Sequence, residues 1–196
     1  PFSDRIFGPS ARYLCSAGGV ADASLLERIR RTGVDIIEFY GSSEASVVAL
    51  TLRGHWRPGC SGVLAPDVEA RIGPDGELAV RSPGVMPGYL GDRDATKAAF
   101  DAEGYYLTGD LAEIAADRTL RILGRKRDVF NTPEGSNIYP ARIEQQIESL
   151  APVQAAVLVG DQRPYLSALV VPREPVAASG APFLEPHAHA ALYERI

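Results

Sequence analysis

Three short clusters in this chain combine residue types that could bind charged ligands. The first is Tyr40-Gly41-Ser42-Ser43-Glu44, in which two hydroxyls and a carboxylate follow a short apolar run. A carboxylate at the end of a buried strand could hold Mg²⁺, and a neighbouring hydroxyl could bond a phosphate oxygen. The same residue types also suit a turn whose hydroxyls satisfy local backbone groups. Taken alone, the first cluster leaves these two interpretations open.

The other two clusters lie further along the chain. Asp110 follows Thr108 and Gly109, and a carboxylate held at a tight glycine turn can accept two hydrogen bonds from a ribose diol. The third cluster runs from Gly124 to Asp128 and contains Arg125, whose guanidinium would stay charged beside a nucleotide. Each cluster has an ordinary alternative, which is a common Gly-Asp turn for the second and a solvated interdomain linker for the third.

Several other chemistries lack the residues that they need. Neither lysine follows a glycine in a phosphate-binding loop of the P-loop type. Ala45 stands where the nucleophile elbow Gly-x-Ser-x-Gly requires its last glycine. The three histidines, His55, His187 and His189, show no paired carboxylate or metal-ligand spacing.

The elements around the first cluster predict an αβ unit. Residues 12–16 read as a strand, a helix capped by Asp22 or Ser24 runs through Arg31, and residues 34–39 form a buried strand. We therefore expect a parallel sheet, and ligands gather at the carboxyl ends of such strands.

From about His55 the pattern changes to short alternating strands. Residues 68–72 and 77–81 predict a hairpin around the turn 73–76, and residues 111–114 and 120–123 predict a second pair. Strands at this spacing favour a small antiparallel sheet or barrel.

A third pattern follows the charged connector formed by the third cluster, Gly124 to Asp128. It predicts a helix over 141–150 and strands over 155–159 and 166–171. The predicted fold class is therefore mixed α/β, in three parts. These are the end of an αβ parallel-sheet subdomain (1–54), a small antiparallel β-barrel (55–124), and a hinge with an incomplete, mobile α/β subdomain (125–196).

Composition narrows the class of protein. A net charge of −5 argues against a nucleic-acid partner, and no apolar run reaches the roughly 20 residues that span a bilayer. The two cysteines, Cys15 and Cys60, are too few for a disulfide framework, which fits a cytoplasmic protein.

The order and separation of the clusters indicate a protein family, whereas each cluster alone does not. Tyr-Gly-x-Ser-Glu, Thr-Gly-Asp, Gly-Arg-x-x-Asp and Gly-x-Asn-Ile-x-Pro follow one another, and the stretches 84–89 and 160–165 support the series. This series resembles the ANL superfamily of adenylate-forming enzymes, and within it the fatty acyl-CoA synthetases. The resemblance covers nearly the whole chain.

The resemblance implies a role for each matching residue. Tyr40 would stack near the adenine, Ser43 would bond the α-phosphate and Glu44 would bind Mg²⁺. Asp110 would hold the ribose with help from Arg125, so that Ser43, Glu44 and Arg125 are the expected catalytic residues. Further nucleotide-binding residues implied in this way are Gly18, Gly19, Val20, Glu38, Phe39, Gly41 and Ser42.

Two more positions match mobile parts of the family. Arg127 occupies the hinge position, where Asp or Lys is common, and Gly135 matches the loop that lines the pantetheine tunnel of CoA. Ser43 replaces a usual threonine and keeps the hydroxyl, whereas Val20 departs from a frequent proline.

The resemblance also implies the reaction. The parent enzyme would join a fatty acid to ATP as an acyl-adenylate with release of pyrophosphate, and would then transfer the acyl group to CoA. ATP, Mg²⁺ and CoA are the expected cofactors and cosubstrates. Two alternatives stay open, which are a fatty acyl-AMP ligase that delivers to an acyl carrier protein and a truncated, non-catalytic binding or interaction module.

Members of this family are longer than 196 residues. We expect their phosphate loop before Pro1 and their catalytic lysine after Ile196, since neither Lys97 nor Lys126 is suitably placed. The chain on its own is therefore predicted to be inactive.

Overall fold

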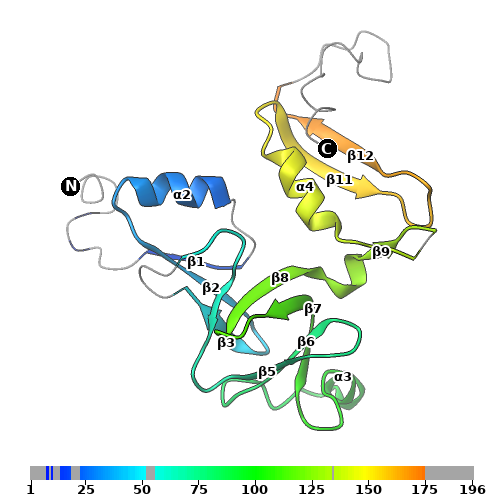
Figure 1. Ribbon diagram of the computed structural model, residues 1–196. Coiled ribbons are helices and arrows are strands. Elements are labelled where there is room, and N and C mark those ends of the chain that lie inside the picture. Colours follow the sequence, from blue (N-terminus) through cyan, green and yellow to red (C-terminus); the bar gives the residue numbers. More distant parts are fainter. Residues whose placement is uncertain are drawn as a thin grey trace. The chain divides into compact units, whose positions relative to one another are not determined.

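The computed structural model describes residues 8, 10, 14–18, 23–51, 56–133 and 135–174. The chain divides into two compact units, Pro1–Arg127 and Asp128–Ile196. Figure 1 shows that the first unit contains most of the strands, and that the described part of the second unit has a helix beside a two-stranded sheet, with a further short strand pair before it.

The first unit begins with an αβ element. β1 (Leu14–Ser16) pairs in parallel with β2 (Ile36–Ser42), and α2 (Ala23–Arg31) connects them. Leu26 of α2 is buried with Val34 and Ile36, which explains why the helix packs along the two strands (Figure 1). The predicted αβ arrangement with a parallel strand pair is confirmed.

β2 continues past the predicted end at Phe39 and turns back on itself. After a turn over 43–45 the chain returns as β3 (Ser46–Leu50), antiparallel to β2. Gly41 permits this close return, because a Cβ there would lie 1.9 Å from the carbonyl oxygen of Ser46. The Tyr-Gly-Ser-Ser-Glu cluster thus forms the tip of a β-hairpin.

The remaining strands of the first unit extend the same sheet. β4 (Gly62–Leu64) joins β3 to β8 (Thr119–Arg125), and the order is β1-β2-β3-β4-β8-β7-β6-β5. Within the described residues this sheet is open, with β1 and β5 at its edges, so the predicted barrel-like packing takes the form of an open, mostly antiparallel sheet. The mixed α/β class is confirmed. The other elements are β5 (Glu69–Ile72), β6 (Glu77–Arg81), α3 (Arg93–Ala98) and β7 (Tyr106–Ile114).

The sheet strands that follow β1 share one apolar core. Its most deeply buried large side chains, with less than 2% of their surface exposed, include Val48 of β3, Leu78 and Val80 of β6, and Leu120 of β8. Burial of such side chains stabilises each by about 1.5–3 kcal/mol relative to exposure. The strands that carry the three predicted clusters therefore rest on a common support.

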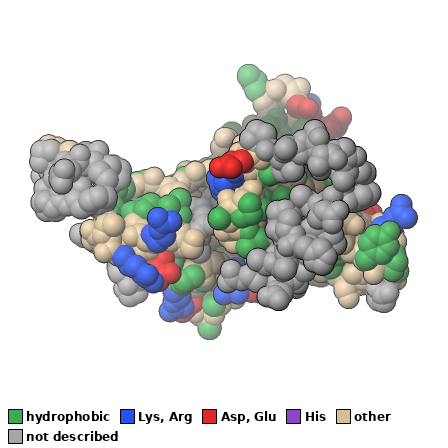
Figure 2. All heavy atoms as spheres, turned by 90° about the horizontal axis from the view of Figure 1, so that it is seen from above, with side chains coloured by type: hydrophobic (Ala, Val, Ile, Leu, Met, Phe, Trp, Pro, Cys, Tyr) green, Lys and Arg blue, Asp and Glu red, His purple; other side chains and the backbone are tan. Residues whose placement is uncertain are grey.

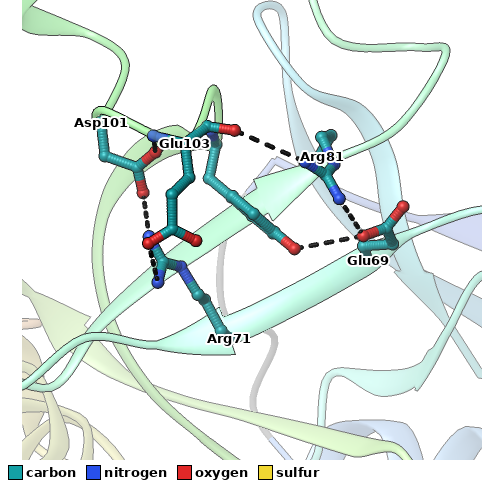
Figure 3. A network of polar contacts seen from close by, with 6 residues as sticks. Glu69, Arg71, Arg81, Asp101 and Glu103 are labelled. Carbon is teal, nitrogen blue, oxygen red and sulfur yellow. Dashed lines mark hydrogen bonds and ion pairs between the residues drawn. The ribbon is translucent and has the colours of Figure 1, made fainter.

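An exposed polar network holds the loop before β7 against the β5–β6 hairpin (Figure 3). Arg81 binds Glu69 across the strand pair at 2.5 Å, and Arg71 binds Asp101 at 2.6 Å. Both guanidinium groups also lie over the ring of Tyr105, at 4.7 Å for Arg71 and 4.5 Å for Arg81. Water screens these exposed pairs, so they position the loop more than they stabilise the fold.

The second unit is a small α/β element. α4 (Pro140–Glu148) packs on β11 (Val153–Val159), which pairs with β12 (Ser167–Pro172), and Ile147 and Val153 are buried between helix and strand. Two carboxylates of the helix accept backbone N–H groups of β11, at 2.7 and 3.0 Å, and so satisfy its outer edge. Before them, β9 (Phe130–Asn131) and β10 (Asn137–Ile138) form a short hairpin.

The surface of the described residues is mixed in charge. On the face shown in Figure 2, Lys and Arg side chains lie among Asp and Glu side chains rather than in one basic patch. Among the helices in the described part of the chain, none has the length and apolar character needed to cross a membrane.

Candidate functional site

Asp110 is the centre of the candidate site. It lies in β7 opposite Arg125 of β8 in antiparallel register, and only 7% of its surface is exposed. The hydroxyl of Tyr40, from β2, donates to Asp110 Oδ2 at 2.6 Å, and Arg125 Nε lies 3.2 Å from Oδ1. The structure therefore brings together three predicted residues from three strands.

Asp110 has one neutral hydrogen-bond donor and one cation beside it. Burial raises the pKa of the Tyr40 hydroxyl, and the hydrogen bond to Asp110 raises it further, so Tyr40 remains a donor at neutral pH. Arg125 is 54% exposed and balances the carboxylate from the solvent side. A carboxylate held in this way by one neutral donor and one cation can accept further hydrogen bonds from ligand hydroxyls.

The tight glycine turn expected before Asp110 is instead an irregular stretch inside β7, and β6 fixes its position. Thr108 Oγ1 donates to the carbonyl oxygen of Leu78 at 2.8 Å and accepts from the Asp110 N–H at 3.1 Å. Gly109 has a φ of 71°, a left-handed conformation that favours glycine, and its N–H donates to Glu77 Oε1 at 2.9 Å. An open hollow of about 660 Å³ beside this part of β7 is lined by Gly109, Arg125, Lys126 and Arg127.

Glu44 lies at the tip of the β2–β3 hairpin. Its own backbone N–H and the hydroxyl of Ser42 lower the pKa of its carboxyl, and Tyr89 donates to Glu44 Oε1 at 3.2 Å. The positive charge of Arg125 lowers this pKa to a smaller extent, which relates Glu44 electrostatically to the Asp110 group. Ser43, beside Glu44, is exposed. An anionic carboxylate and an exposed serine thus occupy neighbouring positions.

The Mg²⁺ ion expected at Glu44 fits a site whose ligands come partly from the protein and partly from the nucleotide. In the described residues, no group of three or more His, Cys, Asp or Glu side chains could hold a metal ion by itself. Mg²⁺ in nucleotide enzymes is usually bound by one or two carboxylates together with substrate phosphates. The charged Glu44 suits that arrangement, in which the nucleotide supplies further ligands.

Other predicted residues have different surroundings. The carboxylate of Glu38 lies 3.6 Å from Arg30, and burial raises its pKa while hydrogen bonding to Trp56 opposes the shift. Phe39 pairs with Leu50 in the β2–β3 ladder. Gly18 follows β1 with a positive φ, and Gly19 and Val20 lie outside the described residues.

The two residues expected to act in the conformational change lie at or beyond the boundary between the units. Arg127 is the last residue of the first unit and belongs to a short 3₁₀ helix, η1 (Lys126–Asp128). Gly135 lies in the turn between β9 and β10, where its N–H donates to the carbonyl oxygen of Thr132 at 2.9 Å. Its φ of 85° is a backbone conformation that favours glycine.

Sequence reasoning missed two contacts of this site. Glu77 was expected only as a strand residue, and Tyr89 only as part of a supporting stretch. A carboxylate beside the apolar run Leu78-Ala79-Val80 was the available signal for Glu77, because a buried charge needs partners.

Comparisons with known proteins agree with the motif series. Residues 4–90 match a family model described as AMP-binding enzyme, and residues 127–188 match the AMP-binding enzyme C-terminal domain. The long-chain-fatty-acid–CoA ligase FadD15 of Mycobacterium tuberculosis is 37% identical over 164 residues, which are 83% of this chain and 27% of that protein. Human long-chain-fatty-acid–CoA ligase 6 is 31% identical over 188 residues, covering 89% of this chain and 27% of its own length. The chain thus spans about a quarter of these relatives.

Solved structures show the same likeness in three dimensions. The o-succinylbenzoate CoA synthetase of Bacillus subtilis, in complex with its acyl-adenylate intermediate, has a TM-score of 0.79 and 28% identity, over 96% of this chain and 40% of that chain. The same enzyme with ATP and a magnesium ion has a TM-score of 0.78, with 28% identity over 96% of this chain and 41% of that chain. ATP-bound MatB of Rhodopseudomonas palustris has a TM-score of 0.75 at 27% identity, over 94% of this chain and 39% of that chain.

Proposed function

Because this chain belongs to the AMP-binding enzymes of the ANL superfamily of adenylate-forming enzymes, we propose that it supplies nucleotide-binding and hinge residues to a fatty acyl-CoA ligase. The observation that best supports this proposal is the buried Asp110 carboxylate, held by Tyr40 from one side and Arg125 from the other. The names of the relatives favour a fatty acid as the acyl substrate and CoA as the acceptor.

In the proposed first half-reaction, the chain's residues position ATP. Asp110 accepts hydrogen bonds from the ribose hydroxyls, and Arg125 and Tyr40 keep its carboxylate charged and oriented. Ser43 bonds the α-phosphate, so that the phosphorus faces the incoming fatty-acid carboxylate, and Glu44 holds Mg²⁺. Mg²⁺ held at Glu44 would supply positive charge that neutralises the phosphate oxygens. Pyrophosphate leaves as the acyl-adenylate forms.

In the proposed second half-reaction, the acyl group passes to the thiol of CoA. The backbone around Arg127 changes conformation, and the turn at Gly135 lines the path of the pantetheine arm. An acyl carrier protein as acceptor is the alternative, and the CoA ligases among the relatives favour CoA. We place the protein in the cytoplasm, in accord with its two unpaired cysteines, Cys15 and Cys60.

The test is Asp110→Ala in the full-length product of the gene that contains this chain. Loss of a positioned, charged hydrogen-bond acceptor should cost about 2 kcal/mol or more, which is a drop of more than about tenfold in adenylate formation at subsaturating ATP. Adenylate is trapped with hydroxylamine and pyrophosphate is measured in parallel. Asp117→Ala is the matched control, because Asp117 lies in the turn before β8, at the opposite end of that strand from Arg125, and binds the exposed Arg57.

Three results would change the conclusion. Equal rates for wild type and Asp110→Ala would make Asp110 a turn residue only. No adenylate from wild-type protein with any fatty acid would favour the non-catalytic binding module. Adenylate formation followed by transfer to a carrier protein, and not to CoA, would favour the acyl-AMP ligase.

A further inference from the structure

Glu77 is a buried carboxylate whose two oxygens serve different partners. Only 8% of the residue is exposed, at the first position of β6. Oε1 accepts the N–H of Gly109 at 2.9 Å, and Oε2 accepts from Lys126 Nζ at 2.7 Å. Gly109 directly precedes Asp110, so Glu77 contacts the backbone next to the carboxylate that is proposed to bind ribose.

Lys126 connects the same carboxylate to the start of the hinge segment. It follows Arg125 directly and precedes Arg127, and its ammonium group also donates to Asp75 Oδ2 at 2.5 Å. The two carboxylates raise the pKa of Lys126 to about 12, so the ammonium group stays charged. One lysine thus ties η1 to the β5–β6 turn and to the partner of Gly109.

We propose that Glu77 and Lys126 are positioning residues for nucleotide binding, which hold the backbone of β7 at Gly109 and link it to the segment that precedes the hinge. The inference rests on the proposed role of Asp110 in binding ribose. Glu77 fixes the backbone N–H at Gly109 and Lys126 neutralises Glu77. A displacement of Lys126 therefore reaches Asp110 through two hydrogen bonds.

Burial of the Glu77 carboxylate, and not of the half-exposed Lys126, distinguishes this pair from an ordinary surface ion pair. Arg81 and Glu69 in the same hairpin are joined at 2.5 Å, but both side chains are about half exposed and their partners belong to the loop before β7 (Figure 3). The side chain of Glu77 is 10% exposed. Removal of a buried acceptor leaves the Gly109 N–H without its partner, whereas removal of Glu69 exposes only groups that water can solvate.

The experiment compares matched substitutions in the full-length gene product. Glu77→Ala removes both acceptors, Glu77→Gln keeps one oxygen for Gly109, and Lys126→Met removes the cation while Lys126→Arg retains it. Glu69→Gln is the control, because it breaks an ion pair in the same hairpin. The first readout is hydrogen–deuterium exchange at the Gly109 amide, resolved by mass spectrometry, and it needs no activity.

We expect Glu77→Ala to speed Gly109 exchange by about tenfold or more, because a hydrogen bond to a charged acceptor is lost. Glu77→Gln and Lys126→Met should give smaller increases, and Lys126→Arg and Glu69→Gln should stay within about twofold of wild type. Equal exchange in Glu77→Ala and Glu69→Gln would overturn the proposal.

The second readout separates positioning from general damage. We expect Glu77→Ala to raise the KM for ATP by about tenfold, with the KM for the fatty acid within about twofold of wild type. An unchanged KM for ATP in an active variant, or equal changes for both substrates, would overturn the positioning role. If wild-type protein forms no adenylate, the proposed function fails instead. AMP affinity by calorimetry then replaces the KM, and affinity equal in Glu77→Ala and Glu69→Gln overturns the inference.

Discussion

Tyr40 joins two of the sequence clusters through a single hydrogen bond. Its hydroxyl is 2.6 Å from Asp110 Oδ2, across a separation of 70 residues in the chain. Because burial and Asp110 both raise the pKa of the hydroxyl, it donates throughout the neutral range. We therefore propose a second role for Tyr40 besides its proposed contact with adenine, which is to orient the carboxylate that is proposed to bind ribose.

Tyr40→Phe tests this second role with the ring retained. Loss of a hydrogen bond to a charged group costs about 1.5–3 kcal/mol, so we expect AMP to bind at least about tenfold more weakly to the full-length protein. Isothermal titration calorimetry measures the affinity.

Tyr105→Phe is the control, because it removes the same hydroxyl from a tyrosine whose partner is the exposed Glu69. If both variants bind AMP as wild type does, the Tyr40 hydroxyl does not orient Asp110 for nucleotide binding.

At the residue scale, motif order predicted much of the site. Tyr40, Asp110 and Arg125 were each identified from short motifs, and the structure places them in contact. Glu77 could not be found in this way. Its contact with Gly109 depends on the register of β6 against β7, which is irregular between Glu77 and Ala79, and a sequence motif does not specify that irregularity.

At the element scale, the β2–β3 hairpin is the main departure from expectation. Val47-Val48-Ala49-Leu50 has a strand-like composition, but no strand was predicted after the Tyr-Gly-Ser-Ser-Glu cluster. The tight return depends on Gly41 and on Ser46, which has a φ of 56°. A non-glycine residue in this conformation is uncommon, so propensity alone does not predict it.

The β9–β10 turn carries the prediction at this scale. Gly135→Leu in the full-length protein should leave adenylate formation within about threefold of wild type, whereas acyl-CoA formation should fall by about tenfold or more, because the side chain would enter the proposed thiol path. Hydroxylamine trapping measures the first step and thioester chromatography the second.

Gly104→Leu controls for backbone strain. Gly104 has a φ of 80° and open space around it, much as Gly135 does, but it lies in the loop before β7. If Gly135→Leu loses both steps in equal proportion, or Gly104→Leu has the same selective effect, the assignment of Gly135 to the CoA path is wrong.

At the scale of the whole molecule, the chain consists of two compact units that meet at Arg127 and Asp128. The sequence predicted a charged connector here, because Gly124 to Asp128 lies between a region of predicted short strands and a region with a predicted helix followed by strands. The division of the first unit at 54/55 stays a prediction, since one sheet includes strands from both sides of that position. Local sequence patterns do not determine which strands pair when the strands are far apart in the chain.

The 196-residue chain alone is predicted to release no pyrophosphate from ATP in the presence of fatty acid, Mg²⁺ and CoA. It spans 27% of the length of the fatty-acid–CoA ligases described above, so it lacks any contacts to ATP that the rest of such a protein supplies. ATP affinity should be millimolar or weaker, since several charge-assisted hydrogen bonds, each contributing roughly 1.5–3 kcal/mol, would be lost. Calorimetry and a pyrophosphate assay measure both quantities, with the full-length protein as the positive control. A micromolar dissociation constant would show that Tyr40, Asp110 and Arg125 suffice.

The hairpin of β7 and β8 also constrains how this protein can change in length. Asp110 and Arg125 face each other only because the connection over 115–118 fixes the register of the two strands. Arg118 stabilises that connection, with a φ of 64° and a guanidinium that donates to the carbonyl oxygens of Ala65 and Val68 at 3.0 Å. Surface turns usually tolerate insertions, but one extra residue that slipped this register would turn Arg125 to the opposite face of the sheet. Among related sequences, we therefore expect insertions and deletions to be rare in this turn, although it lies at the opposite end of the paired strands from Asp110 and Arg125.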